Sequence, residues 1–118
     1  MEEKKQEQLV KVTVRNIAES PLKLRLVADA VRGKNAQEAL DILSLINKKG
    51  SITMIKAINS GIANAKVLYG VTEPESLKIS KLTVDAGKTL KRTAFASRGR
   101  VSRIDKRRSH INLELTVK

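Results

Sequence analysis

The segment Leu90–His110, LKRTAFASRGRVSRIDKRRSH, restricts the fold of this chain more than any other. It holds eight Lys or Arg residues and a single acid, Asp105, and it offers few apolar side chains to a core. The segments before and after it, LKISKLTV and HINLELTVK, alternate apolar and polar residues, which is typical of half-buried strands. We therefore expect these two strands to be neighbours in a sheet. Residues 86–104 should extend beyond that sheet as a hairpin arm on the order of 30 Å long.

The remainder of the chain predicts one more strand and three helices. LVKVTVR alternates as a strand does, while ESPLKLRLVADAVRGK, NAQEALDILSLI and SITMIKAINSGIANAKVLY follow helical spacing. This order predicts an α+β fold, with three helices packed on a small antiparallel three-stranded sheet and a long basic β-hairpin arm projecting from it. The length of 118 residues suits one domain over residues 1–118.

Residue types at the helix ends and on the helix faces make this prediction more specific. Ser20 is placed to cap the first helix, Pro21 fits its first position, and Gly33 fits its end. Asn35 and Glu38 resemble a capping box for the second helix. In the first helix we expect Asp29 to pair with Arg25 at i,i+4. We expect its apolar face to comprise Leu22, Leu26, Val27, Ala30 and Val31.

The second helix should pack through Ala39, Leu40, Leu43 and Ile46, and the third through Ile55, Ile58, Ile62, Ala65 and Tyr69. Gly61 lowers helix propensity by about 1 kcal/mol relative to Ala. Because it shares a ridge of small residues with Ala57 and Ala65, we expect it to permit close packing. The strand pattern slips phase between Ile79 and Leu82, which predicts a β-bulge.

The charge of the chain predicts a polyanionic partner. It carries 24 basic and 12 acidic residues, a net charge of +12, and residues 88–118 alone contribute +8. A two-stranded ribbon is marginally stable in water, so an arm of this composition needs a phosphate-bearing surface to complete it. The only aromatic residues are Tyr69 and Phe95, which disfavours modules that stack bases on rings. A folded RNA recognised through its backbone fits best.

Two other classes of protein are alternatives on composition alone. A DNA-bending architectural protein also projects basic β-arms, and Phe95 is a possible wedge between base pairs. An RNA-processing enzyme needs a carboxylate cluster or an activated base, and the arm contains only Asp105 as an acid.

Several kinds of chemistry are disfavoured by the residues present. The chain has no Cys and only one His, His110, so disulfides and thiolate metal sites are excluded. His110 lacks a Ser, His and carboxylate arrangement around it, and we interpret it as a structural or phosphate-contacting residue. We expect no enzymatic activity, no cofactor and no metal. Neither an apolar signal segment nor an apolar run of membrane length is present, so we expect a cytoplasmic protein without membrane contact.

The motifs SPLKLRLVADAVRGK, ALDIL, NKK, SGIANA, LTVDAGKTLKR, RGR and KRRSHI, in this order, resemble the large-ribosomal-subunit protein L22 family from about Val12 to Val117. The resemblance implies a structural constituent of the large subunit that binds its ribosomal RNA early in assembly. It implies a globular part near the exit of the nascent-peptide tunnel and an arm in the tunnel wall, near a constriction and the macrolide site. The implied partners are ribosomal RNA, neighbouring large-subunit proteins and the nascent peptide, without homo-oligomerisation.

The family motif matches this chain at Ser20, Pro21, Lys23, Arg25, Arg32, Gly33, Lys34, Lys48, Lys49, Gly87, Lys91, Arg92, Gly99, Arg100, Lys106, Arg107, Ser109 and His110. The chain departs from the pattern at Ala18, where an Arg is usual, and at Phe95 and Ala96, where a Pro-Arg pair is common.

From the charge pattern and the resemblance together, we predict RNA contacts by Arg15, Lys23, Arg25, Arg32, Lys34, Lys48, Lys49, Lys88, Lys91, Arg92, Arg98, Arg100, Arg103, Lys106, Arg107, Arg108 and His110. We predict a tunnel-facing hairpin tip at Thr93, Ala94, Phe95, Ala96 and Ser97.

Overall fold

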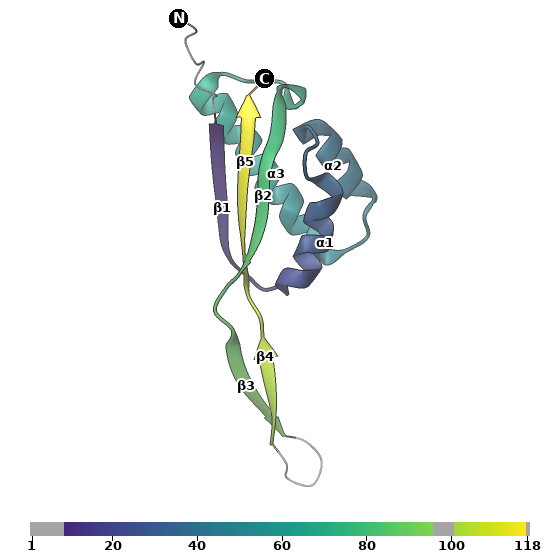
Figure 1. The fold of residues 1–118 in the computed structure, drawn as a ribbon, viewed down its shortest axis with the longest axis vertical. Coiled ribbons are helices and arrows are strands. Elements are labelled where there is room, and N and C mark those ends of the chain that lie inside the picture. The colour runs from purple at the N-terminus through teal and green to yellow at the C-terminus, as the bar shows by residue number, and fades with distance from the viewer. Residues whose placement is uncertain (1–8, 96–100, 118) are drawn as a thin grey trace, which may run out of the picture.

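The computed structural model describes residues 9–95 and 101–117, and within 90–95 and 101–105 it describes the backbone alone. Its elements, in chain order, are β1 (Leu9–Ile17), α1 (Pro21–Val31), α2 (Ala36–Leu45), α3 (Lys49–Tyr69), a short 3-10 helix (Pro74–Ser76), β2 (Leu77–Ala86), β3 (Leu90–Phe95), β4 (Val101–Lys106) and β5 (Ser109–Val117). The helices cover one face of a sheet, and a narrow ribbon leaves one end of that sheet (Figure 1). The predicted α+β class is confirmed.

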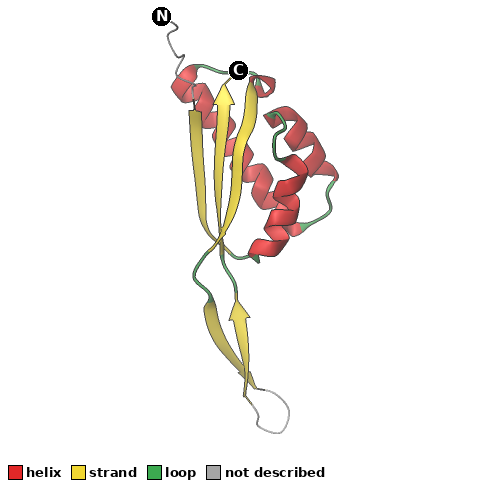
Figure 2. Ribbon diagram, viewed as in Figure 1, coloured by secondary structure: helices red, strands yellow, loops and turns green. Residues whose placement is uncertain are grey.

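The main sheet has the order β1-β5-β2, and both of its pairings are antiparallel. Ile111, Leu113 and Leu115 of the central strand are buried, as their alternation predicts. The register between β2 and β5 shifts between Ile79 and Lys81, which confirms the predicted bulge. One face of the sheet packs against the helices (Figure 2). The burial pattern of the same strands places their polar residues on the other face.

Helix α1 faces the sheet with a different stripe from the one predicted. Leu22 and Leu26 are 64% and 62% exposed, and Ala30 is exposed too. Only Val27 and Val31 of the predicted face are buried, where they join Leu24 and Ala28. Both stripes are apolar, so the pattern alone did not distinguish them.

Two arginines explain this orientation, because they bond to the outer edge of β2. Arg25 Nε donates to the carbonyl oxygen of Val84 at 3.1 Å, and Arg32 Nε donates to that of Leu82 at 3.0 Å. The predicted pairing of Asp29 with Arg25 is wrong: Asp29 Oδ1 accepts a bond from Arg32 Nη1 instead. These bonds occupy edge carbonyls that an added strand would otherwise use.

The helix ends agree in part with the sequence. Ser20 has the extended backbone of an N-cap residue, but its side chain makes no capping hydrogen bond; Pro21 follows at the first position. Asn35 Oδ1 accepts from the amide of Glu38 at 2.8 Å, as expected for a cap. Gly33 follows α1 with a φ of +82°, which confirms the predicted helix end.

Helix α3 lies against β1 and β5 through its small residues. Ala57, Gly61 and Ala65 are buried, and a Cβ added at Gly61 would lie 2.6 Å from Leu115 Cδ1. The predicted close approach at Gly61 is therefore confirmed. Tyr69 is an exception to the predicted stripe: it is 38% exposed, and its hydroxyl donates to the carbonyl oxygen of Leu9 at 3.0 Å.

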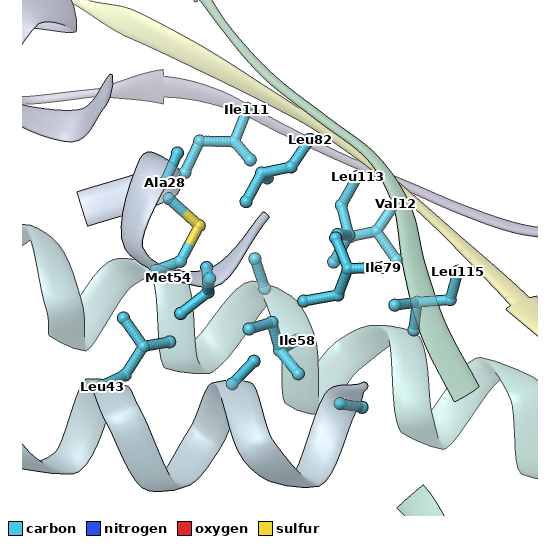
Figure 3. Packing of buried hydrophobic residues seen from close by; sticks show 14 of the residues in the cluster. Val12, Ala28, Leu43, Met54, Ile58, Ile79, Leu82, Ile111, Leu113 and Leu115 are labelled. Carbon is cyan, nitrogen blue, oxygen red and sulfur yellow. The ribbon is translucent and has the colours of Figure 1, made fainter. Parts of the chain in front are cut away.

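The core lies between the helices and the sheet. Figure 3 shows Met54, Ile58 and Leu43 of the helices facing side chains of the sheet. The large residues of this core that are no more than 1% exposed include Leu24, Leu43, Met54, Ile58, Leu77, Ile79, Leu82, Ile111, Leu113 and Leu115.

Strands β3 and β4 pair antiparallel from Leu90 opposite Lys106 to Phe95 opposite Val101, and they form a separate two-stranded sheet. The molecule is accordingly elongated, with extents of 73 × 32 × 22 Å. The sequence predicts an arm that continues the β2–β5 ladder directly, whereas the structure places the arm in a separate sheet. Residues 87–89 and 107–108 interrupt the strands between the two sheets.

Candidate nucleic-acid interface

Three consecutive cations lie at the root of the arm, where the ribbon joins the main sheet. Lys106 ends β4, and Arg107 and Arg108 connect it to β5. The amide of Gly87 donates to the carbonyl oxygen of Arg108 at 2.8 Å, so the two connecting segments are held together. Lys106 and Arg107 are exposed and Arg108 is half-buried. Their charges are therefore attached to a backbone that the folded domain fixes.

These three cations line a groove of about 450 Å³, which we call the root groove. Its opposite wall is the segment Ala18–Ser20, between β1 and α1. The root groove thus brings together residues about 90 positions apart in the sequence.

A second groove of about 500 Å³ shares the segment Ala18–Ser20 and extends toward the helices. We call it the helix groove. Its lysines are Lys23 of α1 and Lys48 and Lys49 at the start of α3, and Leu26 and Gly50 complete its lining. We call the two grooves together the basic saddle, because they lie on either side of one loop.

The saddle is lined by six cations and one acid, Glu19. The Glu19 side chain is held by a hydrogen bond, in which Oε1 accepts from Thr53 Oγ1 at 3.0 Å. Its Oε2 lies 3.1 Å from the position that a Cβ would take at Gly50. The carboxylate therefore sits at the N-terminus of α3, where the helix dipole offsets its charge. The field over the saddle is consequently positive.

A buried side chain of the core also holds the backbone of the saddle in place. Ser109 is fully buried, and its hydroxyl donates to the carbonyl oxygen of Glu19 at 2.6 Å. This bond joins the first residue of β5 to the loop before α1. At the N-terminus of α1, the Ser20 side chain makes no capping bond and the first turn contains no acid, so that helix end adds positive potential beside Lys23.

Other predicted RNA-binding residues lie outside the saddle. Arg25 and Arg32 hold the edge of β2, and Lys34 follows them as an exposed residue past the end of α1. The described contacts give the two arginines a structural role in addition to the predicted RNA contact. Lys88 is exposed between β2 and β3.

Arg15 and His110 line a separate groove at the end of the sheet, of about 390 Å³, together with Thr13, Asn16, Asp85 and Asn112. His110 Nδ1 accepts from the amide of Asn16 at 3.1 Å.

The rest of the predicted site belongs to the arm. Lys91, Arg92 and Arg103, and Thr93, Ala94 and Phe95 of the predicted tip, lie on strands for which the backbone alone is described. Arg98, Arg100, Ala96 and Ser97 lie outside the described residues.

Sequence reasoning missed the loop between β1 and α1 as a wall of the site. The sequence marks Ala18 as a departure from the family pattern and Ser20 as a helix cap and a family match, but none of Ala18, Glu19 and Ser20 is a cation that would indicate an RNA contact. Asn16, with its φ of 57°, is the local signal that was available, because Asn tolerates this left-handed conformation and marks a change of chain direction.

Over the described ranges 9–95 and 101–117, no group of three or more acidic or His side chains is placed to hold a metal ion. In the same part of the chain, none of the helices is both long enough and apolar enough to span a membrane.

A comparison with protein-family models matches residues 12–116 to the family described as Ribosomal protein L22p/L17e. The match includes most of β1, the three helices, the residues that line both grooves and both strands of the arm.

Proposed function

The chain belongs to the ribosomal protein L22p/L17e family, whose members are structural constituents of the large ribosomal subunit that bind its RNA, and from this premise we propose that the basic saddle is the main anchor for that RNA. The observation that carries the proposal is the position of the saddle. Six cations from three separate parts of the chain meet around one loop, and the single acid among them is engaged by Thr53.

The physical case for an anchor rests on preorganisation. Long cationic side chains lose conformational freedom when they bind, and a fixed backbone reduces the part of that cost that falls on the chain. Arg108 is fixed through its carbonyl oxygen, and the next residue, Ser109, is fixed through its hydroxyl. Arg107 and Arg108 also offer planar donor groups that match phosphate oxygens.

The arm has a second role in this proposal. Within the described residues β3 and β4 form a sheet of two strands, and a ribbon of this kind needs an outside surface to order it fully. We assign that surface to ribosomal RNA of the peptide tunnel. The globular part then lies near the tunnel exit, and Thr93–Ser97 faces the nascent peptide at the wall.

The same proposal covers the cellular setting. Ribosomal RNA and neighbouring large-subunit proteins are the partners that the family implies. We further propose that the chain joins the subunit as a single copy, early in assembly, in the cytoplasm, and that it acts without catalysis or a cofactor.

Subunit occupancy in cells tests this division of roles. Replacing Lys106, Arg107 and Arg108 together by Ala should reduce incorporation into the large subunit. Deleting Thr93–Ser97 should permit incorporation but change nascent-chain stalling or the response to macrolides. If the deletion empties the subunit while the triple substitution incorporates normally, the assignment of anchor and tip is wrong.

A matched control separates position from total charge. Lys66, Lys78 and Lys81 are exposed, do not line the saddle, and carry the same total charge as the root triple. Replacing these three by Ala should leave incorporation close to that of the unmodified chain.

A further inference from the structure

The root of the arm contains a contact among three strands that the RNA-binding proposal does not use. His110 of β5, Asn16 of β1 and Gly87, which follows β2, meet where the sheet ends. We propose that His110 is a positioning residue, whose neutral imidazole holds these three segments together and so sets the direction in which the arm leaves the domain. The proposal concerns the free protein and does not depend on which RNA the arm contacts.

The first part of the contact fixes the tautomer of the ring. The amide of Asn16 lies 3.1 Å from His110 Nδ1. A backbone N–H can only donate, so Nδ1 must be unprotonated and the proton of the neutral ring must sit on Nε2. Asn16 presents this amide because its φ is 57°, at the point where the β1–β5 register shifts between Val14 and Ile17.

The second part of the contact leaves little room for a side chain at position 87. A Cβ there would lie 3.0 Å from His110 Nε2, 3.2 Å from its Cε1 and 3.3 Å from the backbone carbon of Arg108. The imidazole therefore packs directly against the Gly87 backbone. The amide of the same glycine donates to the carbonyl oxygen of Arg108 at 2.8 Å and so joins the two connecting segments.

Together, the two parts make His110 a bridge between the edge strands. It sits on the central strand, bonds to β1 on one side and packs on the end of β2 on the other. The arm strands begin three residues beyond Gly87 and end three residues before Ser109. A change in the bridge therefore alters the point from which both arm strands extend.

The charge state of the ring decides whether the bridge exists. Protonation of Nδ1 would place a donor against the Asn16 donor, so the imidazolium cannot make this bond. The charged groups that share the groove with the ring are Asp85, its cross-strand partner on β2, and Arg15 on β1. Asp85 Oδ2 also accepts from Asn112 Nδ2 at 2.7 Å.

Nuclear magnetic resonance of the unmodified protein tests the tautomer directly. The nitrogen of Asn16 and Nδ1 of His110 should show a scalar coupling across their hydrogen bond at neutral pH, and the ring should be protonated on Nε2. Acidification that protonates the ring should abolish the coupling and shift the Asn16 amide together with the ring signals. A ring protonated on Nδ1 at neutral pH would overturn the proposal without any variant.

Amide exchange in variants tests the positioning role. His110→Ala should speed exchange of the Gly87 amide by about fivefold or more, the scale of one lost hydrogen bond. The amide of Ile58 in α3 should change much less. His110→Asn, which retains an acceptor near the Nδ1 position, should restore part of the protection. Unchanged protection of Gly87 in His110→Ala would show that the imidazole does not hold the root.

A double substitution tests the close packing. Gly87→Ala should displace the ring and speed exchange at Asn16, and it should lower the urea midpoint more in the unmodified background than in His110→Ala. Equal effects of Gly87→Ala in the two backgrounds would mean that the ring and Gly87 are not coupled, which contradicts the bridge.

Discussion

The hydroxyl of Ser109 donates to the carbonyl oxygen of Glu19 at 2.6 Å, and this bond connects the first residue of β5 to the wall shared by both grooves of the saddle. Ser109 is fully buried, so if its hydroxyl were removed, water could not easily take its place as the donor to the Glu19 carbonyl oxygen. The saddle and the core are therefore coupled through one side chain. Stability and RNA affinity should respond together when this bond is removed.

Ser109→Ala should lower the free energy of unfolding by about 1–3 kcal/mol, because a carbonyl group in a partly buried site loses its partner. Urea unfolding followed by circular dichroism measures the change. Ser80→Ala is the matched control, since Ser80 Oγ donates to the carbonyl oxygen of Glu114 at 3.1 Å in an exposed position. Equal effects of the two substitutions would show that burial of the Ser109 bond does not matter.

Gly61→Ala should destabilise the protein although it raises helix propensity. The propensity gain is about 1 kcal/mol. The added Cβ would lie 2.6 Å from Leu115 Cδ1 and 3.3 Å from Val12 Cγ2, so overpacking should cost about 1–3 kcal/mol and exceed that gain. The neighbouring exposed position offers the control, because Ser60→Ala changes propensity without the clash. A higher unfolding midpoint for Gly61→Ala than for Ser60→Ala would contradict the packing of α3 on the sheet.

Arg32→Ala should lower the free energy of unfolding by about 1 kcal/mol, because the Leu82 carbonyl at the edge of β2 loses its bond. The nearby exposed Lys34 provides the comparison, since Lys34→Ala removes the same charge while its backbone keeps the bond from the Ile79 amide of β2. If the two variants unfold at the same urea concentration, the bond from Arg32 has no structural role.

Replacing residues 89–106 by a short glycine turn should leave a folded domain. The described core residues lie between Val10 and Val84 and between Ile111 and Leu115, outside this segment. The free energy of unfolding should change by no more than about 1 kcal/mol, the scale expected from a shorter loop. Calorimetry of the shortened chain checks this. Loss of a cooperative transition would mean that the arm is part of the folding unit.

Much of this fold follows from local patterns. The alternation of HINLELTVK fixes which face of β5 is buried, and the slip after Ile79 marks the bulge that the register confirms. The buried face of α1 could not be predicted from the local pattern, because the stripe that contains Leu22 and the stripe that contains Leu24 are both apolar. Arg25 and Arg32 resolve this choice through bonds to β2, 59 and 50 residues later in the chain, and such partners are not visible in the helix itself.

The candidate site was predictable by charge but not by shape. The cations Lys106, Arg107 and Arg108 stand out in the sequence, whereas the opposing wall, Ala18–Ser20, is chemically ordinary. The fold brings this segment to the site, where the Ser109 hydroxyl bonds to the Glu19 carbonyl oxygen. The interruption of the arm at residues 87–89 was also missed, because the contact of Gly87 with His110 joins residues from different strands.

The salt dependence of binding to large-subunit ribosomal RNA tests the central claim, that the basic saddle anchors this RNA, most directly. Each phosphate contact contributes about 0.7–0.9 to the slope of log affinity against log salt concentration. Replacement of Lys106, Arg107 and Arg108 by Ala should therefore lower the magnitude of that slope by about 2–3. The equally charged control with Lys66, Lys78 and Lys81 replaced by Ala should lower it by less than about 1. Equal slopes for the two triple variants would contradict the claim, because they would show that total charge, and not the saddle, binds the RNA.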